Sequence, residues 1–184
     1  LIDSKTNTNI GKSPLFPKYE TFADFLSNTI IGKRKHTISE FFYRTQHIQQ
    51  LGGYQIYPAG YYADDASILL FCNNNGIAST EESLIVYRKS ENNISSSSCW
   101  NVEKSKAALK YYQWIIDEFP MKQQDEQIIQ QRLDFDLYTY FSAALNIHQS
   151  IQILNCIPVN IWNWKKKLLC LYKFILNSYA KQIK

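Results

Sequence analysis

The pattern of apolar residues changes near residue 100, and this change constrains the fold more than any other feature. After Asn101, apolar side chains recur at intervals of three and four residues, which is the spacing of one face of a helix. The pattern predicts three helices. The first covers residues 104–119 and ends at Pro120, the second covers residues 125–149, and the third covers residues 160–184, after Pro158. Residues 101–184 are therefore predicted to form a helical C-terminal region.

The region before residue 100 is predicted to mix helices and strands, which makes the expected class α/β. Residues 21–31 have helical spacing and stop at Gly32, and a second helix is expected to begin at Ala63 or Asp64 and to close over residues 73–76. Residues 37–44 and 83–88 are predicted to be strands. Residues 47–51 are expected to form a short helical turn, residues 90–98 a loop, and residues 1–18 a linker or trailing loop.

The basic residues are concentrated at the end of the chain. The formal net charge is +4, and residues 165–184 hold six of the 20 Lys and Arg residues but none of the 16 Asp and Glu residues. The rest of the chain is therefore slightly acidic, which argues against a nucleic-acid partner. No long uninterrupted apolar run and no signal-peptide pattern is present, so a soluble or peripheral protein is expected. Since the chain begins at Leu1 rather than Met, it is expected to be a piece of a longer protein.

The cysteines give no sign of a metal site. They are widely spaced, form no C-x-x-C pair and lie far along the chain from the three histidines; they are Cys72, Cys99, Cys156 and Cys170. A zinc site or a disulfide framework is therefore not expected. Buried, reduced thiols in a cytoplasmic protein are expected instead.

Two adjacent carboxylates, Asp64 and Asp65, stand out because they directly precede an apolar run. At the N-terminus of the predicted helix, its partial positive charge would stabilise their charged forms. An isolated Asp-Asp pair in such a place is explained by a helix cap with a solvated neighbour. The sequence around this pair supports another explanation.

Several short blocks around the acidic pair resemble one glycosyltransferase family. In chain order they are Tyr43-Arg44, Leu51-Gly-Gly-Tyr54, a Pro-Ala-Gly loop, Ala63-Asp-Asp-Ala-Ser-Ile-Leu-Leu70, Asn75-Gly-Ile77 and Val86-Tyr-Arg-Lys-Ser-Glu-Asn-Asn-Ile-Ser95. Their order and spacing resemble the second half of an inverting family-two glycosyltransferase. The resemblance covers about residues 19–100, and it is more specific than any one block.

The resemblance implies a partial GT-A lobe, which is a Rossmann-like α/β sheet with few strands in this chain. Residues 19–100 would form its acceptor-side half, between the 1–18 linker and a helical extension over 101–184. Asp65 matches the general base of the family and Asp64 its acidic neighbour. The implied activity of the longer protein is transfer of a hexose from a nucleotide-sugar to a glycan or lipid-linked acceptor. Polysaccharide synthesis for the cell surface is the expected setting.

Other residues near the pair have both a structural and a functional explanation. Gly52 and Gly53 would make a tight turn or would let the backbone approach the acceptor, and the two roles are compatible with each other. Arg44 and Arg88 would be ion-pair partners or would lie near the diphosphate or the acidic pair. The neighbouring tyrosines would stack on sugar rings or only pack in the fold; they are Tyr54, Tyr57, Tyr61 and Tyr62.

In the family, an Asp-x-Asp motif upstream of the Gly-Gly block holds a divalent cation, Mg²⁺ or Mn²⁺. No such motif and no nucleotide-binding half precede residue 19 here. Asp134-Phe135-Asp136 has the same letters but lies in a helical pattern, where two carboxylates two residues apart face different sides. We expect a solvated helix surface there. The 184 residues alone are expected neither to bind a nucleotide-sugar tightly nor to transfer sugar.

The last segment, residues 158–184, combines aromatic and aliphatic residues with six lysines. Such a segment would lie on an anionic membrane, at the cytoplasmic face, or would be a domain-closing helix with a lysine-rich solvated side. A truncated lobe would also expose apolar surface, which predicts self-association. The alternative to an enzyme is a non-catalytic binding or assembly module that keeps the glycosyltransferase lobe.

Overall fold

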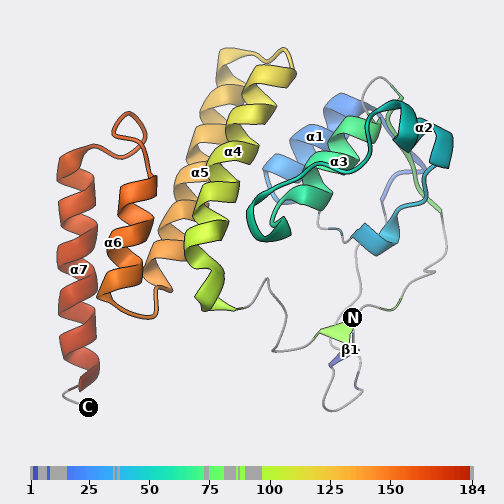
Figure 1. Cartoon of the computed structure of the whole chain (residues 1–184). Helices are drawn as coiled ribbons and strands as arrows, with labels where there is room; N and C mark the ends of the chain where they lie inside the picture. Colours follow the sequence, from blue (N-terminus) through green and yellow to red (C-terminus); the bar gives the residue numbers. More distant parts are fainter. Residues whose placement is uncertain are drawn as a thin grey trace. The chain divides into compact units, whose positions relative to one another are not determined.

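The computed structural model describes residues 2–3, 8, 16–34, 36, 38–72, 75–80, 86, 88–89 and 97–182 (Figure 1). It is an α/β structure with mostly helical content. The chain divides into two compact units, residues 1–96 and residues 97–184.

The described residues of the first unit form three α-helices, which are α1 (Phe22–Ile30), α2 (Thr45–Gln50) and α3 (Ala63–Cys72). Its strands have two residues each: β1 (Ile2–Asp3) pairs in parallel with β4 (Arg88–Lys89), and β2 (Tyr19–Glu20) pairs antiparallel with β3 (Ile77–Ala78). Short 3-10 helices span Ile38–Glu40 and Pro58–Gly60. Helices α1 and α3 pack against each other and provide most of the buried apolar side chains of this unit.

Helix α1 begins and ends where the sequence predicts. The Thr21 side chain accepts a hydrogen bond from the Asp24 amide at 3.2 Å, which satisfies one of the open amides of the first turn. Gly32, with a φ of 74°, follows the last turn. Arg34 then folds back so that its guanidinium lies 2.9 Å from Glu20, and both side chains are buried. This ion pair joins the end of α1 to strand β2.

The predicted strand over residues 37–44 is wrong. Residues 38–40 form a 3-10 turn, and residues 41–44 belong to neither a helix nor a strand. The alternation that suggested a strand is real, since Phe42 and Arg44 are exposed while Phe41 and Tyr43 point inward. The inward side chains pack in an aromatic cluster instead of belonging to a sheet. Of the predicted strand over residues 83–88, residues 83–85 and 87 lie outside the described part of the chain.

The second unit is helical, as predicted. A 3-10 turn (Ser98–Trp100) leads into α4 (Asn101–Glu118), α5 (Gln123–Ser142), α6 (Ile147–Cys156) and α7 (Trp164–Gln182). Helices α4 and α5 have the most extensive contact, α6 packs on α4 and α5, and α7 packs on α6 (Figure 1). The predicted helix over residues 125–149 is in fact two helices. The chain turns after Ser142, and the Asn146 side chain caps α6 by accepting from the Gln149 amide at 2.9 Å.

The carboxylates of Asp134 and Asp136 leave α5 toward different neighbours, as predicted, but they do not form a solvated surface. Asp134 accepts hydrogen bonds from the Trp162 indole and from the Lys166 ammonium, and so connects α5 to the segment that starts α7. Asp136 is buried and accepts from the Tyr112 hydroxyl at 2.6 Å, with Arg132 at 3.5 Å. Both acids therefore hold neighbouring helices together.

The four cysteines are free thiols. Cys72 and Cys170 are buried, as predicted, and Cys156 is partly buried. Cys99 is exposed in the 3-10 turn before α4, so the prediction of a buried thiol is wrong at this position. Within the described part of the chain, no helix is both long enough and apolar enough to cross a membrane.

The hydrogen bond between Tyr112 and Asp136 gives a first prediction. Tyr112→Phe removes a buried donor to a carboxylate and is expected to lower the free energy of unfolding of the second unit by about 1.5–3 kcal/mol. Urea unfolding followed by tryptophan fluorescence measures this unit, because all four tryptophans lie after residue 97. Tyr138→Phe, at a half-exposed tyrosine of α5, is the matched control. Equal destabilisation by both variants would contradict this role of the hydrogen bond.

Candidate functional site

The approach to α3 is a loop with unusual backbone conformations. Ala59 and Tyr62 have φ angles of 52° and 65°, in the left-handed region that residues with a side chain rarely adopt. The buried Ser67 side chain holds this loop, because its hydroxyl donates to the Ala63 carbonyl at 2.6 Å and accepts from the Gln55 amide at 2.8 Å. The loop over residues 55–62 is therefore tied to the first turns of α3.

Asp64 and Asp65 lie in the first turn of α3, at its positive end, as predicted. Neither Ala63 nor Asp64 precedes the helix as a cap, because the helix already includes Ala63. Burial raises the pKa of Asp64, and the charge of Asp65 raises it further. Hydrogen bonds from the backbone, such as the one from the Asp65 amide to Asp64 Oδ1 at 3.1 Å, oppose the shift without cancelling it. The charged form of Asp64 is therefore penalised in the folded protein.

His36 is the partner of Asp65, and the sequence analysis did not identify it. Its Nε2 lies 3.0 Å from Asp65 Oδ1, at ion-pair distance although without the alignment of a hydrogen bond. The His36 side chain is only 3% exposed, whereas that of Asp65 is 32% exposed. The imidazole lies between Phe25 and Phe41, with ring centroids 5.6 and 5.2 Å away. The pair therefore has a buried member held by aromatic rings and a partly exposed member.

Aromatic rings continue from His36 along the inner side of this unit. Phe41 stacks on Tyr43, and Tyr43 and Tyr54 each pack edge-on against Phe71 of α3. Burial raises the pKa of Tyr43, so its hydroxyl stays protonated at neutral pH. His47 Nε2 lies 2.8 Å from the Phe71 carbonyl and connects α2 to the end of α3. These contacts position the helices around the acidic pair.

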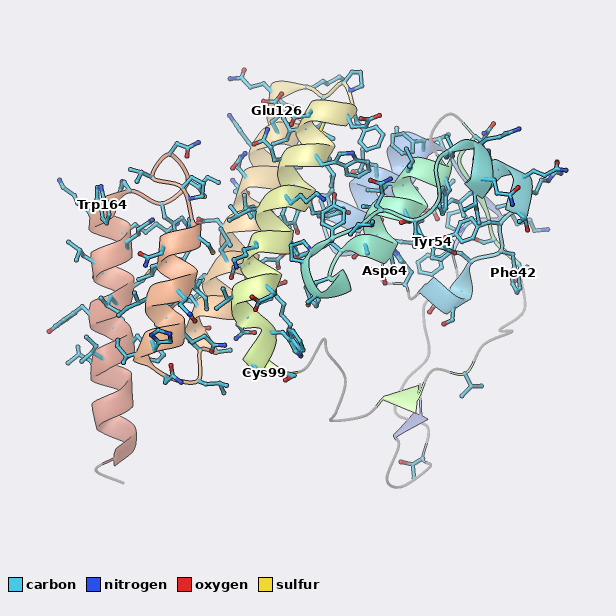
Figure 2. All side chains as sticks on the ribbon, viewed as in Figure 1. Phe42, Tyr54, Asp64, Cys99, Glu126 and Trp164 are labelled. Carbon is cyan, nitrogen blue, oxygen red and sulfur yellow. The ribbon has the colours of Figure 1, made fainter. Side chains whose placement is uncertain are left out.

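The four tyrosines predicted near the site have different environments. Tyr57 is buried, and burial raises its pKa to about 12, so it packs in the core. Tyr54 is about half exposed at the edge of the aromatic cluster (Figure 2). Tyr61 and Tyr62 are partly exposed and pack edge to face, with ring centroids 5.0 Å apart. Tyr54, Tyr61 and Tyr62 therefore keep some ring surface available to a ligand.

Gly52 and Gly53 form the tight turn that the sequence predicts. Their φ angles are 82° and 86°, and they end α2 with two backbone hydrogen bonds, from Gly53 to Ile48 at 2.9 Å and from Gly52 to Gln49 at 3.2 Å. This bond pattern is that of a Schellman motif, which favours glycine. A close approach of this turn to an acceptor stays a prediction.

The two arginines predicted near the site lie at the start of α2 and in β4. Arg44 is exposed at the N-terminus of α2, and within the part of the chain that the structure describes it makes no ion pair. Arg88 lies in β4, opposite Ile2 of β1. A role for either residue near the diphosphate or the acidic pair stays a prediction.

Among the residues that the structure describes, none forms a divalent-cation site of the Asp-x-Asp kind. Asp134 and Asp136 have its spacing, but their carboxylates point to different helices and already bind Lys166 and Tyr112. Over the described ranges, no group of three or more His, Cys, Asp and Glu side chains could hold a metal ion. The Asp-Phe-Asp triplet therefore does not fit Mg²⁺ or Mn²⁺.

The glycine turn gives a second prediction. A Cβ added to Gly53 would meet no atom within 4 Å, so Gly53→Ala tests backbone strain alone. The left-handed conformation is expected to cost roughly 1–2 kcal/mol and to increase hydrogen exchange of the α2 amides. Gly53→Asn is the control, because Asn adopts this conformation more readily and should lose less. Equal exchange in the wild type and in Gly53→Ala would contradict the requirement for glycine.

The raised pKa of Asp64 gives a third prediction. Folded Asp64 holds its proton more tightly than the unfolded chain does, so its contribution to stability is greatest at low pH and falls as pH rises through the folded pKa. Asp64→Asn does not titrate, and its stability relative to the wild type should increase from about pH 3.5 to about pH 7. Hydrogen exchange of the α3 amides, compared between variants at each pH, measures this difference.

The matched control for this measurement is Asp125→Asn, at an exposed acid in the first turn of α5. If Asp64→Asn loses protection relative to the wild type as pH rises, the sign of the predicted effect is wrong. If the control changes the protection of α3 to the same extent, the effect does not arise from the burial of Asp64.

Comparison with known proteins adds no family assignment. No protein-family model, no curated protein and no solved structure matches the chain. The resemblance of residues 19–100 to a glycosyltransferase half therefore depends on the sequence blocks themselves, and the chemical role of the acidic pair is a proposal.

Proposed function

We propose that residues 19–100 supply the acceptor side and the general base of an inverting glycosyl transfer, with Asp65 as the base. The main support is the pairing of Asp65 with His36. The imidazole is almost fully buried, so it cannot reach a substrate, whereas the carboxylate is partly exposed. Asp65 is therefore the member of the pair that is accessible to an acceptor hydroxyl, and His36 is a positioning residue.

The proposed reaction needs such a carboxylate, because a sugar hydroxyl is a poor nucleophile until its proton is removed. Asp65 takes the proton of the acceptor hydroxyl while the oxygen forms a bond to the anomeric carbon of the donor. The bond from that carbon to the nucleoside diphosphate breaks on the opposite side, so the configuration inverts. His36 lies 3.0 Å from one carboxylate oxygen and limits its rotation during this step.

The surroundings of Asp65 support an acceptor site next to it. Asp65 lies in the first turn of α3, next to the partial positive charge of the helix N-terminus. Because the pKa of Asp64 is raised, this residue has a smaller tendency to place a second negative charge beside Asp65. Tyr54 and Tyr62 have exposed ring surface that suits stacking on a sugar. The turn at Gly52 and Gly53 has no side chain to block an approaching acceptor.

The donor and its divalent cation are proposed to be bound by other parts of the full-length protein. The described residues offer no fitting cation site, so no step is assigned to a metal held by this chain. The acceptor is a glycan or a lipid-linked sugar, and the proposed setting is synthesis of a surface polysaccharide at the cytoplasmic face of the membrane. Arg44 and Arg88 are candidates for contacts with the diphosphate or the acidic pair.

The fourth prediction tests the base. In the full-length protein, Asp65→Asn is expected to lower kcat by roughly 10²–10⁴-fold, since an amide cannot take the proton. The measurement is release of nucleoside diphosphate from UDP- and GDP-sugars in the presence of glycan acceptors. Asp125→Asn, another first-turn acid, is the matched control and should keep wild-type turnover.

Circular dichroism of the Asp65→Asn variant establishes that it is folded. Wild-type turnover in this variant would show that Asp65 is not the base. If the wild-type protein shows no turnover with any of these donors, while the chain still binds glycans, the non-catalytic binding module is the better explanation.

A further inference from the structure

Helix α7 exposes an almost continuous apolar surface. We define the outer face of α7 by its exposed large apolar residues, which are Trp164, Leu168, Leu169, Tyr172, Ile175 and Leu176. Trp164, Leu168 and Tyr172 are 66%, 64% and 60% exposed and lie four residues apart, so they form one stripe along the helix. Figure 2 labels Trp164 at the start of this stripe. Side chains of this size and exposure are unfavourable in water unless something covers them.

The opposite side of α7 is fixed to the second unit. Lys167 is buried and donates to the carbonyls of Leu154 and Ile157 at 2.7 and 2.5 Å, at the end of α6. Phe174 packs against Phe141 of α5 with ring centroids 5.8 Å apart. Because these contacts hold one side of α7 against protein, the outer face cannot turn inward without breaking them.

The charged residues of α7 are all lysines. Lys165 and Lys173 are exposed at this side of α7, whereas Lys166 and Lys167 are used in contacts with Asp134 and with α6. No Asp or Glu occurs anywhere in residues 137–184, which includes all of α6 and α7. The apolar stripe therefore lies on a helix that carries positive charge and, like α6, has no acidic residue of its own.

We propose that the outer face of α7 binds the surface of an anionic lipid membrane, with the helix lying parallel to the bilayer. Apolar side chains of such a helix enter the boundary between headgroups and acyl chains, and Trp and Tyr favour this region. Lys165 and Lys173 would contact the anionic headgroups. A second copy of the chain is a poorer partner, because its own outer face would bring the same uncompensated lysines together.

The shape of the surface agrees with this partner. The outer face belongs to one helix, and its apolar residues continue over three turns from Trp164 to Leu176. A bilayer surface covers such a face without a complementary groove. This inference does not depend on the proposed chemistry of Asp65, because the residues that carry it all belong to the second unit.

Co-sedimentation of the whole 184-residue chain with vesicles tests the proposal. Phosphatidylcholine vesicles that contain about 30% of the anionic lipid phosphatidylglycerol are compared with vesicles of pure phosphatidylcholine. The wild type is expected to pellet with the anionic vesicles and much less with the neutral ones. Lys165→Gln and Lys173→Gln should each weaken binding about fivefold.

The apolar part of the surface is tested with a triple variant, Trp164→Ser, Leu168→Ser and Tyr172→Ser. It should bind anionic vesicles more than about tenfold more weakly than the wild type, since three large side chains no longer enter the bilayer. The matched control is Phe135→Ser with Tyr138→Ser, which removes exposed aromatic rings of α5 without changing α7. Circular dichroism shows whether each variant is folded.

Three results would overturn the proposal. The wild type could remain in the supernatant with both kinds of vesicle, or the α5 control could lose as much binding as the triple variant. The wild type could also be a dimer by sedimentation equilibrium that the triple variant converts to a monomer, while vesicle binding is absent. That last outcome would assign the outer face to contact between copies of the chain.

Discussion

The first unit depends on how helix α3 is buried. Its middle is enclosed, with Ala66, Ile68 and Leu69 fully buried, whereas its first turn is only half covered. One helix therefore anchors the fold with its middle and presents two carboxylates at its start. The loop before it is tied down through Ser67, so the approach to these carboxylates has a defined conformation. The same helix therefore contributes both to the packed core and to the candidate site.

In the second unit, buried and half-buried charged groups connect the helices. Asp134 and Asp136 connect α5 to Trp162 and Lys166 on one side and to Tyr112 on the other, and Lys167 satisfies carbonyls at the end of α6. Each of these charged groups has a specific partner, which is the condition under which partial burial of charge is tolerated. Because the partners lie on different helices, these contacts fix which helix faces which.

The sequence predicted those parts of the structure whose signals are local. Helices α1 and α3 have helical spacing and clear stops, and the glycine turn at Gly52 and Gly53 depends on neighbouring residues. The break between α5 and α6 was missed, because apolar residues such as Leu145 continue the helical spacing through it. His36 was missed because it lies 29 residues before Asp65 and belongs to no motif; only the packing of Phe25 and Phe41 brings it there.

The environments of the four cysteines have a practical consequence for chemical labelling. Burial raises the pKa of the thiols of Cys156 and Cys170, and it raises that of Cys72 to about 12, so none of these readily forms the reactive thiolate at neutral pH. Cys99 is exposed in the turn that starts the second unit. A maleimide probe would therefore attach first at Cys99, which gives spectroscopists one defined site beside the junction of the two units.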